Sequence, residues 1–169
     1  MKKTLEKINE LIERGIIHAY AIGGGMGQFY YIEPSVTYDL DIIINFASEE
    51  NRLVPLQSIY KWAEENNYET LEEHIIIEGI PVQFLPAYNN LAEEALENAK
   101  EIKLYDLKTF ILEPEYLMAI MLQINRPKDR ERLLKFFEEA EFSEEKFNTI
   151  IKKFNLIKEY KIFRKKYYD

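Results

Sequence analysis

The sequence predicts an α/β (α+β) domain, a small mixed sheet flanked by helices, followed by a C-terminal helical extension. Three observations predict this class. Short apolar runs that favour strands alternate with amphipathic helical patterns up to about residue 112, and a glycine run follows the first strand. Beyond that point the pattern is almost entirely helical. We therefore expect an α/β core over residues 1–112 and a helical region over residues 113–169 that packs on it.

The first half of the chain alternates helices with strands. Apolar residues at helical spacing over 2–14 predict an amphipathic helix that ends at Gly15. A strand over 16–22 leads into the glycine run, and a short helix over 26–31 follows it. The other elements predicted here are a strand over 38–46, a helix over 53–66, and two strands over 68–78 and 80–85 joined by a tight turn at Glu78-Gly79.

Proline positions mark the helices of the second half. Pro114 suits the first turn of a helix, and Pro127 ends that helix because the residue before proline avoids helical geometry. The elements predicted here are a helix capped by Asn89 or Asn90 that runs through Ala99, an extended piece over 101–111, and helices over 114–124, 127–140 and 143–166, the last broken near Asn155.

Composition excludes several classes of protein. Cysteine is absent, which excludes disulfides, thiolate catalysis and cysteine-ligated zinc. No apolar run is long enough to span a bilayer, and Met1-Lys2-Lys3 leads into an amphipathic pattern where a signal peptide needs an apolar stretch. We therefore expect a cytoplasmic protein with no membrane partner.

Charge is unevenly distributed along the chain. Residues 1–125 carry nine Lys/Arg and twenty-one Asp/Glu, a net charge of −12, whereas residues 126–169 carry a net charge of +4. An acidic body repels bulk nucleic acid. Contact with RNA or a nucleotide would have to be focused on the basic C-terminal part or neutralised by metal ions, and the alternative is an ordinary solvated surface.

The run Gly23-Gly24-Gly25 follows the first predicted strand. Glycines allow backbone conformations closed to other residues and let N–H groups approach a ligand closely. If Met26 begins a helix, its free N–H groups favour a phosphate there. A tight strand-to-helix turn without a ligand fits equally well. Other phosphate motifs fail, because a P-loop needs Gly-Lys-Ser/Thr and the dinucleotide fingerprint needs glycine where Gln28 stands.

Asp39 and Asp41 lie two residues apart on the next predicted strand. Both carboxylates therefore project to one face, while Leu40 and Ile42 enter the core on the other. Two anions on one face repel each other unless a cation lies between them. Mg²⁺ suits this arrangement because it prefers carboxylate and phosphate oxygens. A strand end whose charges reach water is the alternative, and the apolar character of the strand favours the metal.

Together these residues resemble a known family. A strand, Gly-Gly, a spacer and then Asp-x-Asp on the next strand is similar to the first motif of the polymerase-β-like nucleotidyltransferase superfamily. The likeness is greatest to the minimal-nucleotidyltransferase and nucleotidyltransferase-like toxin group. The C-terminal helical motif of that group is similar to the segment Arg126-Pro127-Lys128-Asp129-Arg130. It touches residues 16–135, and only the first motif is specific.

The resemblance implies a fold, an activity and a site. The activity is transfer of a nucleoside monophosphate from a nucleoside triphosphate to a hydroxyl of RNA, such as tRNA, or of protein, with Mg²⁺ or Mn²⁺ as cofactor. A cognate antitoxin is the implied partner. Asp39 and Asp41 would bind the metal and act in catalysis with Lys128. Gly24, Gly25, Thr37, Gln83 and Arg126 would contact the nucleotide.

Two positions depart from the family pattern. Met26 stands where a serine usually follows the glycines. A third carboxylate is expected on a following strand, and Gln83 is the residue that alternation places there, because Ile80, Val82 and Phe84 take the core face. An amide neither accepts a proton usefully nor ligates Mg²⁺ as a carboxylate does. Either Glu78 substitutes, or the chain is a weak or inactive nucleotide-binding or partner-binding module.

The remaining charged and aromatic residues have two interpretations each. Lys128 would neutralise the triphosphate in the transition state, whereas the arginines around it form ordinary ion pairs with Asp129 and Glu131 in the alternative. Aromatic residues between the C-terminal lysines, such as Tyr160 and Phe163, stack on RNA bases or dock the last helix, and docking is favoured. The two histidines, His18 and His74, lack metal-ligand spacing and are expected to be structural.

Overall fold

The computed structural model describes residues 1–33, 39–46 and 56–168. Thr37 and the predicted starts of the strand at residue 38 and of the helix at residue 53 lie outside the described residues.

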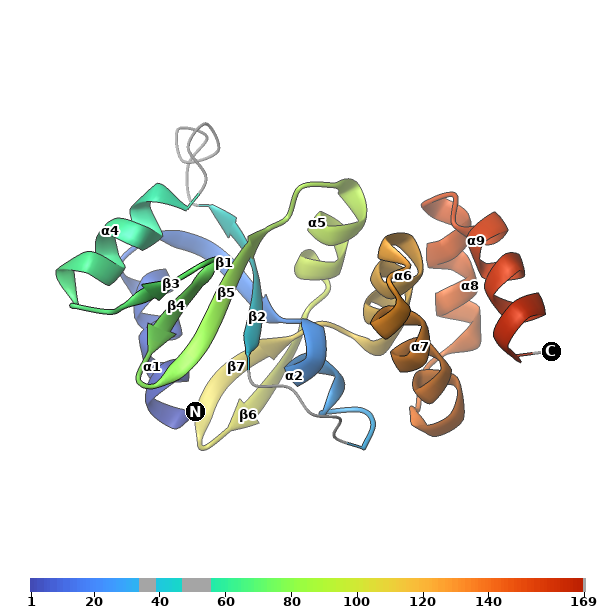
Figure 1. Cartoon of the computed structure of the whole chain (residues 1–169), viewed down its shortest axis with the longest axis horizontal. Helices are drawn as coiled ribbons and strands as arrows, with labels where there is room; N and C mark the ends of the chain where they lie inside the picture. Colours follow the sequence, from blue (N-terminus) through green and yellow to red (C-terminus); the bar gives the residue numbers. More distant parts are fainter. Residues whose placement is uncertain (34–38, 47–55, 169) are drawn as a thin grey trace.

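A mixed sheet forms the centre of the protein (Figure 1). In the described residues it has seven strands in the order β3-β4-β5-β2-β1-β7-β6. The parallel pairs are β2 with β5 and β1 with β7, and the other neighbours are antiparallel. The strands are β1 (Ile17–Ile22), β2 (Leu40–Phe46), β3 (Thr70–Leu71), β4 (His74–Ile77), β5 (Ile80–Pro86), β6 (Lys100–Leu104) and β7 (Leu107–Ile111).

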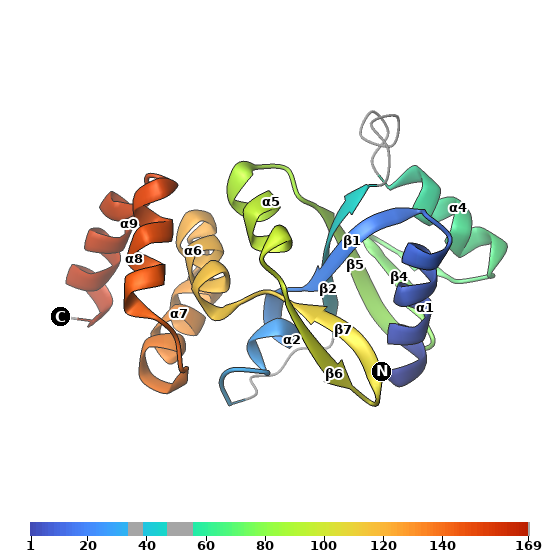
Figure 2. The same ribbon diagram turned by 180° about the vertical axis from the view of Figure 1, so that it is seen from behind.

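Helices cover both faces of this sheet, and the last four continue away from it (Figures 1 and 2). The helices are α1 (Lys2–Glu13), α2 (Gly24–Gln28), α4 (Gln57–Glu65), α5 (Asn90–Glu97), α6 (Pro114–Ile124), α7 (Pro127–Glu139), α8 (Glu144–Lys153) and α9 (Ile157–Phe163), with a π-helical segment over Arg164–Tyr168. The predicted mixed sheet flanked by helices is confirmed. No helix among the described residues is both long and apolar enough to cross a membrane.

Two predicted strands are each a hairpin. The strand predicted over 68–78 is β3 and β4, because Glu72 takes a positive φ of 54° and turns the chain. The extended piece over 101–111 is β6 and β7, joined through Tyr105 and Asp106 at φ values of 52° and 65°. Glycine and asparagine are the usual residues of such turns. These turns contain neither, so the sequence did not signal them.

Three helix boundaries can be compared with the predicted ones. Helix α2 begins at Gly24, two residues before the predicted start, inside the glycine run. Asn89 caps α5 by accepting a hydrogen bond from the Ala92 N–H at 2.9 Å, as predicted. The predicted break near Asn155 is present, and this residue adopts a φ of 58° between α8 and α9.

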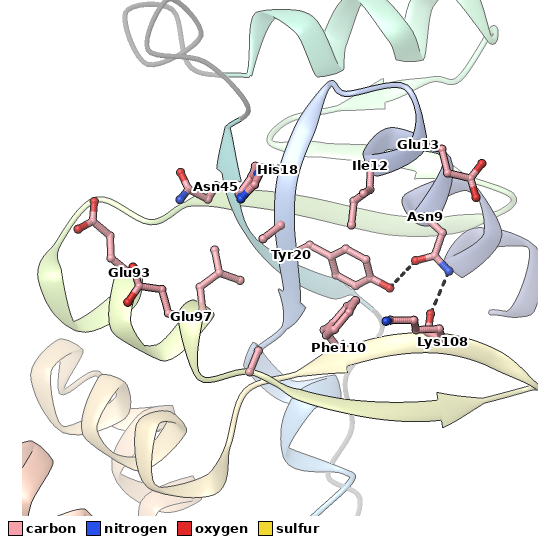
Figure 3. A pocket seen from close by; sticks show the side chains of 13 residues that line it. Asn9, Ile12, Glu13, His18, Tyr20, Asn45, Glu93, Glu97, Lys108 and Phe110 are labelled. Carbon is pink, nitrogen blue, oxygen red and sulfur yellow. Dashed lines mark hydrogen bonds between the residues drawn. The ribbon is translucent and has the colours of Figure 1, made fainter.

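Strands β1 and β7 pair at one end only. Their single register contact joins Ile22 to Ile111. Away from this end a side-chain network connects them: the Tyr20 hydroxyl donates to Asn9 Oδ1 at 2.8 Å, and Asn9 Nδ2 donates to the Lys108 carbonyl at 3.0 Å (Figure 3). An asparagine from α1 thus replaces backbone pairing where the two strands diverge.

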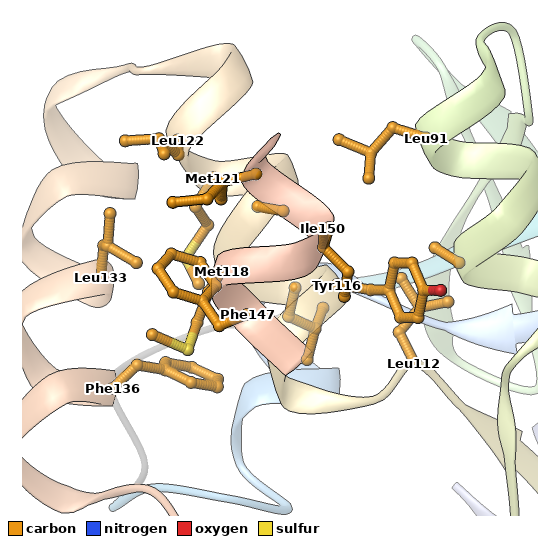
Figure 4. Packing of buried hydrophobic residues seen from close by; sticks show 14 of the residues in the cluster. Leu91, Leu112, Tyr116, Met118, Met121, Leu122, Leu133, Phe136, Phe147 and Ile150 are labelled. Atoms are coloured by element: carbon orange, nitrogen blue, oxygen red, sulfur yellow. The ribbon is translucent and has the colours of Figure 1, made fainter. Parts of the chain in front are cut away.

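Hydrophobic cores lie on opposite faces of the sheet. One joins α1 and α4 to the face that carries Leu40, Ile42 and Ile44 of β2, as the alternation predicts. The other begins at Ala21 and Ile43 on the opposite face and continues through α5 and α6 into the C-terminal helices. Figure 4 shows side chains of α6, α7 and α8 gathered in this second core. It ties the helical region to the face of β2 on which Asp41 lies.

Aromatic side chains dock the last helix on this region, as predicted. Tyr160 stacks on Phe137 with ring centroids 5.9 Å apart, and Phe163 is buried beside it. The Tyr167 hydroxyl accepts a hydrogen bond from Arg130 Nη1 at 3.2 Å. The chain end is therefore anchored to α7.

Candidate functional site

A row of polar residues crosses the sheet where β4, β5 and β2 pair. His74 pairs with Gln83, and Gln83 pairs with Asp41, so the three side chains project to one face. Asp39 lies on the same face, because its Oδ2 is 3.8 Å from His74 Nε2. The Gly23 N–H donates to the Asp41 carbonyl at 2.9 Å. The glycine run therefore lies beside the two aspartates.

Gly24 packs directly against Asp41. A Cβ built on Gly24 would lie 1.6 Å from Asp41 Oδ2, and the backbone there has a φ of +53°. Both the space and the conformation therefore require glycine. Gly25 is buried in α2, whereas Gly24 is partly exposed. Of the two glycines predicted to contact phosphate, Gly24 is the one that lies at the carboxylates.

The environment of Asp41 disfavours a negative charge. Burial raises the pKa of its carboxyl, and the nearby charge of Asp39 raises it further. Positive charge on Lys128, Arg132 and His74 acts in the opposite direction and lowers the pKa. Cationic side chains of α7 and of β4 therefore act on the Asp41 carboxyl.

Helix α7 supplies Lys128 and Arg132, and an ion pair between a half-exposed arginine and a buried aspartate fixes where the helix begins. Asp129 is only 2% exposed and accepts hydrogen bonds from the Arg126 backbone N–H at 3.1 Å and from Arg126 Nε at 2.7 Å. Arg130 donates to the side chain and carbonyl of Asn125, which has a φ of 56°. These contacts hold the turn that precedes α7, the helix whose Lys128 and Arg132 lower the pKa of Asp41.

The structure brings together residues that lie far apart in the sequence. Asp39, Asp41 and Gln83 share one face of the sheet. Gly24 packs on Asp41, and the charge of Lys128 lowers the pKa of Asp41. The charge of Asp41 also raises the pKa of Arg126, although the Arg126 guanidinium is paired with Asp129. Thr37 lies outside the described residues.

Glu78 does not reach this site. It lies in the turn between β4 and β5, and its Oε1 accepts a hydrogen bond from the Tyr68 hydroxyl at 3.1 Å. Tyr68 packs against Trp62 in the core on the α1 and α4 side of the sheet, the face opposite Asp41. The idea that Glu78 substitutes for a third carboxylate is therefore wrong.

Sequence reasoning missed His74, which it treated as structural. Its Nε2 atom is buried and has no hydrogen-bond partner in the described part of the chain. A usable signal was present: a tight turn at Glu78-Gly79 pairs residues equidistant from it, which places His74 opposite Gln83. Register counting from the turn would have brought the histidine into the row.

No family model matches the sequence, and no curated protein sequence matches it significantly. Solved structures do match. The crystal structure of an antigenic nucleotidyltransferase-like protein from Paracoccidioides brasiliensis is 12% identical, with a TM-score of 0.55 over 79% of this chain and 72% of that chain. The crystal structure of ANT(2")-Ia in complex with adenylyl-2"-tobramycin is 15% identical, with a TM-score of 0.55 over 92% and 98% of the two chains. This chain has the polymerase-β-like nucleotidyltransferase fold.

The solution structure of the antibiotic-resistance factor ANT(2'')-Ia agrees, at 15% identity and a TM-score of 0.52 over 90% of this chain and 89% of that chain. Within this nucleotidyltransferase fold the two departures from the family motif have different surroundings. Met26 packs against the core on the α1 and α4 side and offers no hydroxyl. Gln83 lies between His74 and Asp41, where a third carboxylate would face the other two.

Proposed function

We propose that the protein is a metal-dependent nucleotidyltransferase that moves a nucleoside monophosphate from a nucleoside triphosphate to a hydroxyl of RNA or protein. One observation carries the proposal: Gly24 packs on Asp41, beside a second carboxylate on the same face, and positive charge on α7 acts on Asp41. A plain strand-to-helix turn needs no such contact between a glycine and an acidic side chain. An antitoxin partner remains a prediction from the family resemblance.

The residues present fit a divalent metal. Two carboxylates lie on the same face, and the pKa of Asp41 is raised by burial and by the charge of Asp39. A cation bound between them would relieve their repulsion. Their oxygens are the ligands that Mg²⁺ and Mn²⁺ prefer. Among the described residues no group of three His, Cys, Asp or Glu side chains is arranged to hold a metal. Asp39 and Asp41 would therefore hold the ion together with phosphate oxygens.

Protein residues have separate roles in the proposed reaction. A metal bound by the aspartates would neutralise charge on the phosphates. Lys128 and Arg132 add positive charge that acts on Asp41, and this charge would stabilise the negative charge that develops on the leaving pyrophosphate. Gly24 lets the Asp41 carboxylate lie directly against the glycine run, because it has no side chain. Gln83 would orient the nucleotide by hydrogen bonding, and it would not remove the proton of the acceptor hydroxyl.

A second function is favoured by Gln83. Without a carboxylate at this position the protein would bind a metal–nucleotide complex and act as a weak enzyme or as a binding module. Incubating the purified protein with α-labelled nucleoside triphosphates, total RNA and cell protein separates the two functions. Covalent label in RNA or protein supports transfer. Nucleotide binding by calorimetry without any label transfer supports the binding module and contradicts the enzyme.

An amino-sugar acceptor belongs in the same assay, because ANT(2")-Ia was solved with adenylyl-2"-tobramycin.

Replacing the cation of α7 tests its role. Lys128→Gln is expected to weaken triphosphate binding and lower kcat/KM about tenfold, because one exposed charge near the phosphates is lost. Calorimetry and steady-state kinetics measure the two effects. Lys152→Gln, an exposed lysine of α8, is the matched control and should change neither. Equal nucleotide affinity in Lys128→Gln and wild type would remove α7 from the site.

Restoring a carboxylate tests the place of Gln83. Gln83→Glu sets a third acidic side chain beside Asp41 and opposite His74. We expect the variant to be less stable than wild type in chelator, because like charges meet, and to bind Mn²⁺ at least about tenfold more tightly. Thermal melts with and without Mn²⁺ measure both effects. If the variant gains no affinity for Mn²⁺, Gln83 is not at the metal. Gln57→Glu on α4 is the control for added charge.

A further inference from the structure

A sizeable cavity lies away from the two aspartates. Its volume is about 650 Å³, within the range of small-molecule sites. It opens where β1 and β7 diverge, and α1 and α5 border it from opposite faces of the sheet (Figure 3). The diverging strands thus leave a space that reaches both helix layers.

The floor of this pocket is apolar and held in place. Tyr20 and Phe110 meet edge to face with ring centroids 5.7 Å apart. Tyr20 is only 1% exposed, and its hydroxyl is fixed by Asn9, which is itself bound to the Lys108 carbonyl. Leu96 adds an aliphatic surface from α5. Such a floor suits methylene groups or a ring rather than a strongly hydrated anion.

Carboxylates border the pocket from both helices. Glu13 extends from α1, and Glu93 and Glu97 extend from α5 at the other end (Figure 3). None of the three has an ion-pair partner in the part of the chain that is described. Lys108 is neutralised by Glu101 at 2.8 Å, and its ammonium lies 5.2 Å from the Phe110 ring centroid. An ammonium group therefore already lies beside one ring of the pocket floor.

We propose that this pocket binds a linear polyamine, an aliphatic chain with an ammonium group at each end. The methylenes lie on Tyr20, Phe110 and Leu96, and the two ends pair with Glu13 on one side and with Glu93 and Glu97 on the other. The net charge of −12 over residues 1–125 attracts such a cation. This proposal is independent of the nucleotidyltransferase activity, because the aspartate site contributes no lining residue.

Calorimetry with spermidine at physiological ionic strength tests the proposal, because screening then suppresses diffuse surface binding. We expect wild type to bind spermidine and not the uncharged diol of the same chain length. Glu13→Gln and the double variant Glu93→Gln/Glu97→Gln should each weaken binding about tenfold, since each removes the partner of one ammonium group. Glu6→Gln, an exposed carboxylate on α1 outside the pocket, is the matched control and should bind as wild type.

A filling variant tests the cavity without changing charge. Ala99→Leu extends an apolar side chain from a lining position and should abolish spermidine binding while the circular dichroism spectrum is retained. Absence of spermidine binding to wild type overturns the proposal. So does equal binding of the diol, an equal loss of affinity in Glu6→Gln, or full affinity in Ala99→Leu.

Discussion

Asp41→Asn should abolish metal-dependent nucleotide binding and lower transfer about a hundredfold or more, because metal ligation supplies several kcal/mol to phosphoryl chemistry. The same change should raise the melting temperature of the metal-free protein. Burial and Asp39 raise the pKa of Asp41 above its value in the unfolded chain. Stability is therefore lost as the pH rises from the unfolded-state pKa through the folded-state pKa, and asparagine removes that cost.

Thermal melts in chelator and in Mg²⁺ with nucleotide measure both effects. Wild type should gain stability from the metal–nucleotide complex, and Asp41→Asn should not. The gain of the variant in chelator should shrink as the pH falls through the folded-state pKa of Asp41 and disappear below its unfolded-state pKa. Asp106→Asn is the matched control, because Asp106 lies in the β6–β7 turn away from the site. A metal–nucleotide response in Asp41→Asn equal to that of wild type would show that Asp41 is not a ligand.

Gly24→Ala should disrupt both the site and the fold around it. The new Cβ would lie 2.8 Å from Asp41 Cβ as well as 1.6 Å from Oδ2, so rotating the carboxylate cannot relieve the overlap. We expect a loss of about 2 kcal/mol or more of folding free energy, from overpacking added to a left-handed backbone. Nucleotide affinity should fall by at least about tenfold, because Asp41 is displaced.

Gly15→Ala separates these two causes. Gly15 has a φ of +66°, and no atom lies within 4 Å of a Cβ placed there. This control should cost about 1 kcal/mol for the backbone alone and leave nucleotide affinity unchanged. Denaturant unfolding and calorimetry compare the two variants. Equal stability losses, with nucleotide affinity retained in both, would mean that the glycine run is only a turn.

Local patterns were sufficient to predict the central strands and the two aspartates. Alternation of apolar and polar residues placed Leu40 and Ile42 in one core and Asp41 on the opposite face, and the pairing of β2 with β5 agrees. The same rule placed Gln83 on the face away from Val82 and Phe84, and the structure pairs it with Asp41. Pro114 and Asn89 marked the starts of α6 and α5, because the effects of proline and asparagine on the backbone are local.

Long-range packing and unusual turns were beyond the local pattern. Glu72 and Tyr105 turn the chain with positive φ, although neither residue type favours this conformation, so two hairpins were predicted as single strands. The approach of α7 to Asp41 depends on the Arg126–Asp129 contact and on the second core, which no spacing rule reveals. His74 needed the hairpin register, and the pocket between β1 and β7 needed the divergence of two strands.

A crystal structure of the protein with Mn²⁺ and a non-hydrolysable nucleoside triphosphate analogue would test the central claim most directly. The anomalous signal of Mn²⁺ locates the ion without ambiguity. We predict one Mn²⁺ peak in contact with carboxylate oxygens of Asp39 and Asp41, with the triphosphate lying between Gly24 and the Lys128 side of α7. A triphosphate bound elsewhere on the chain, or Mn²⁺ that contacts neither aspartate, would contradict the proposed site.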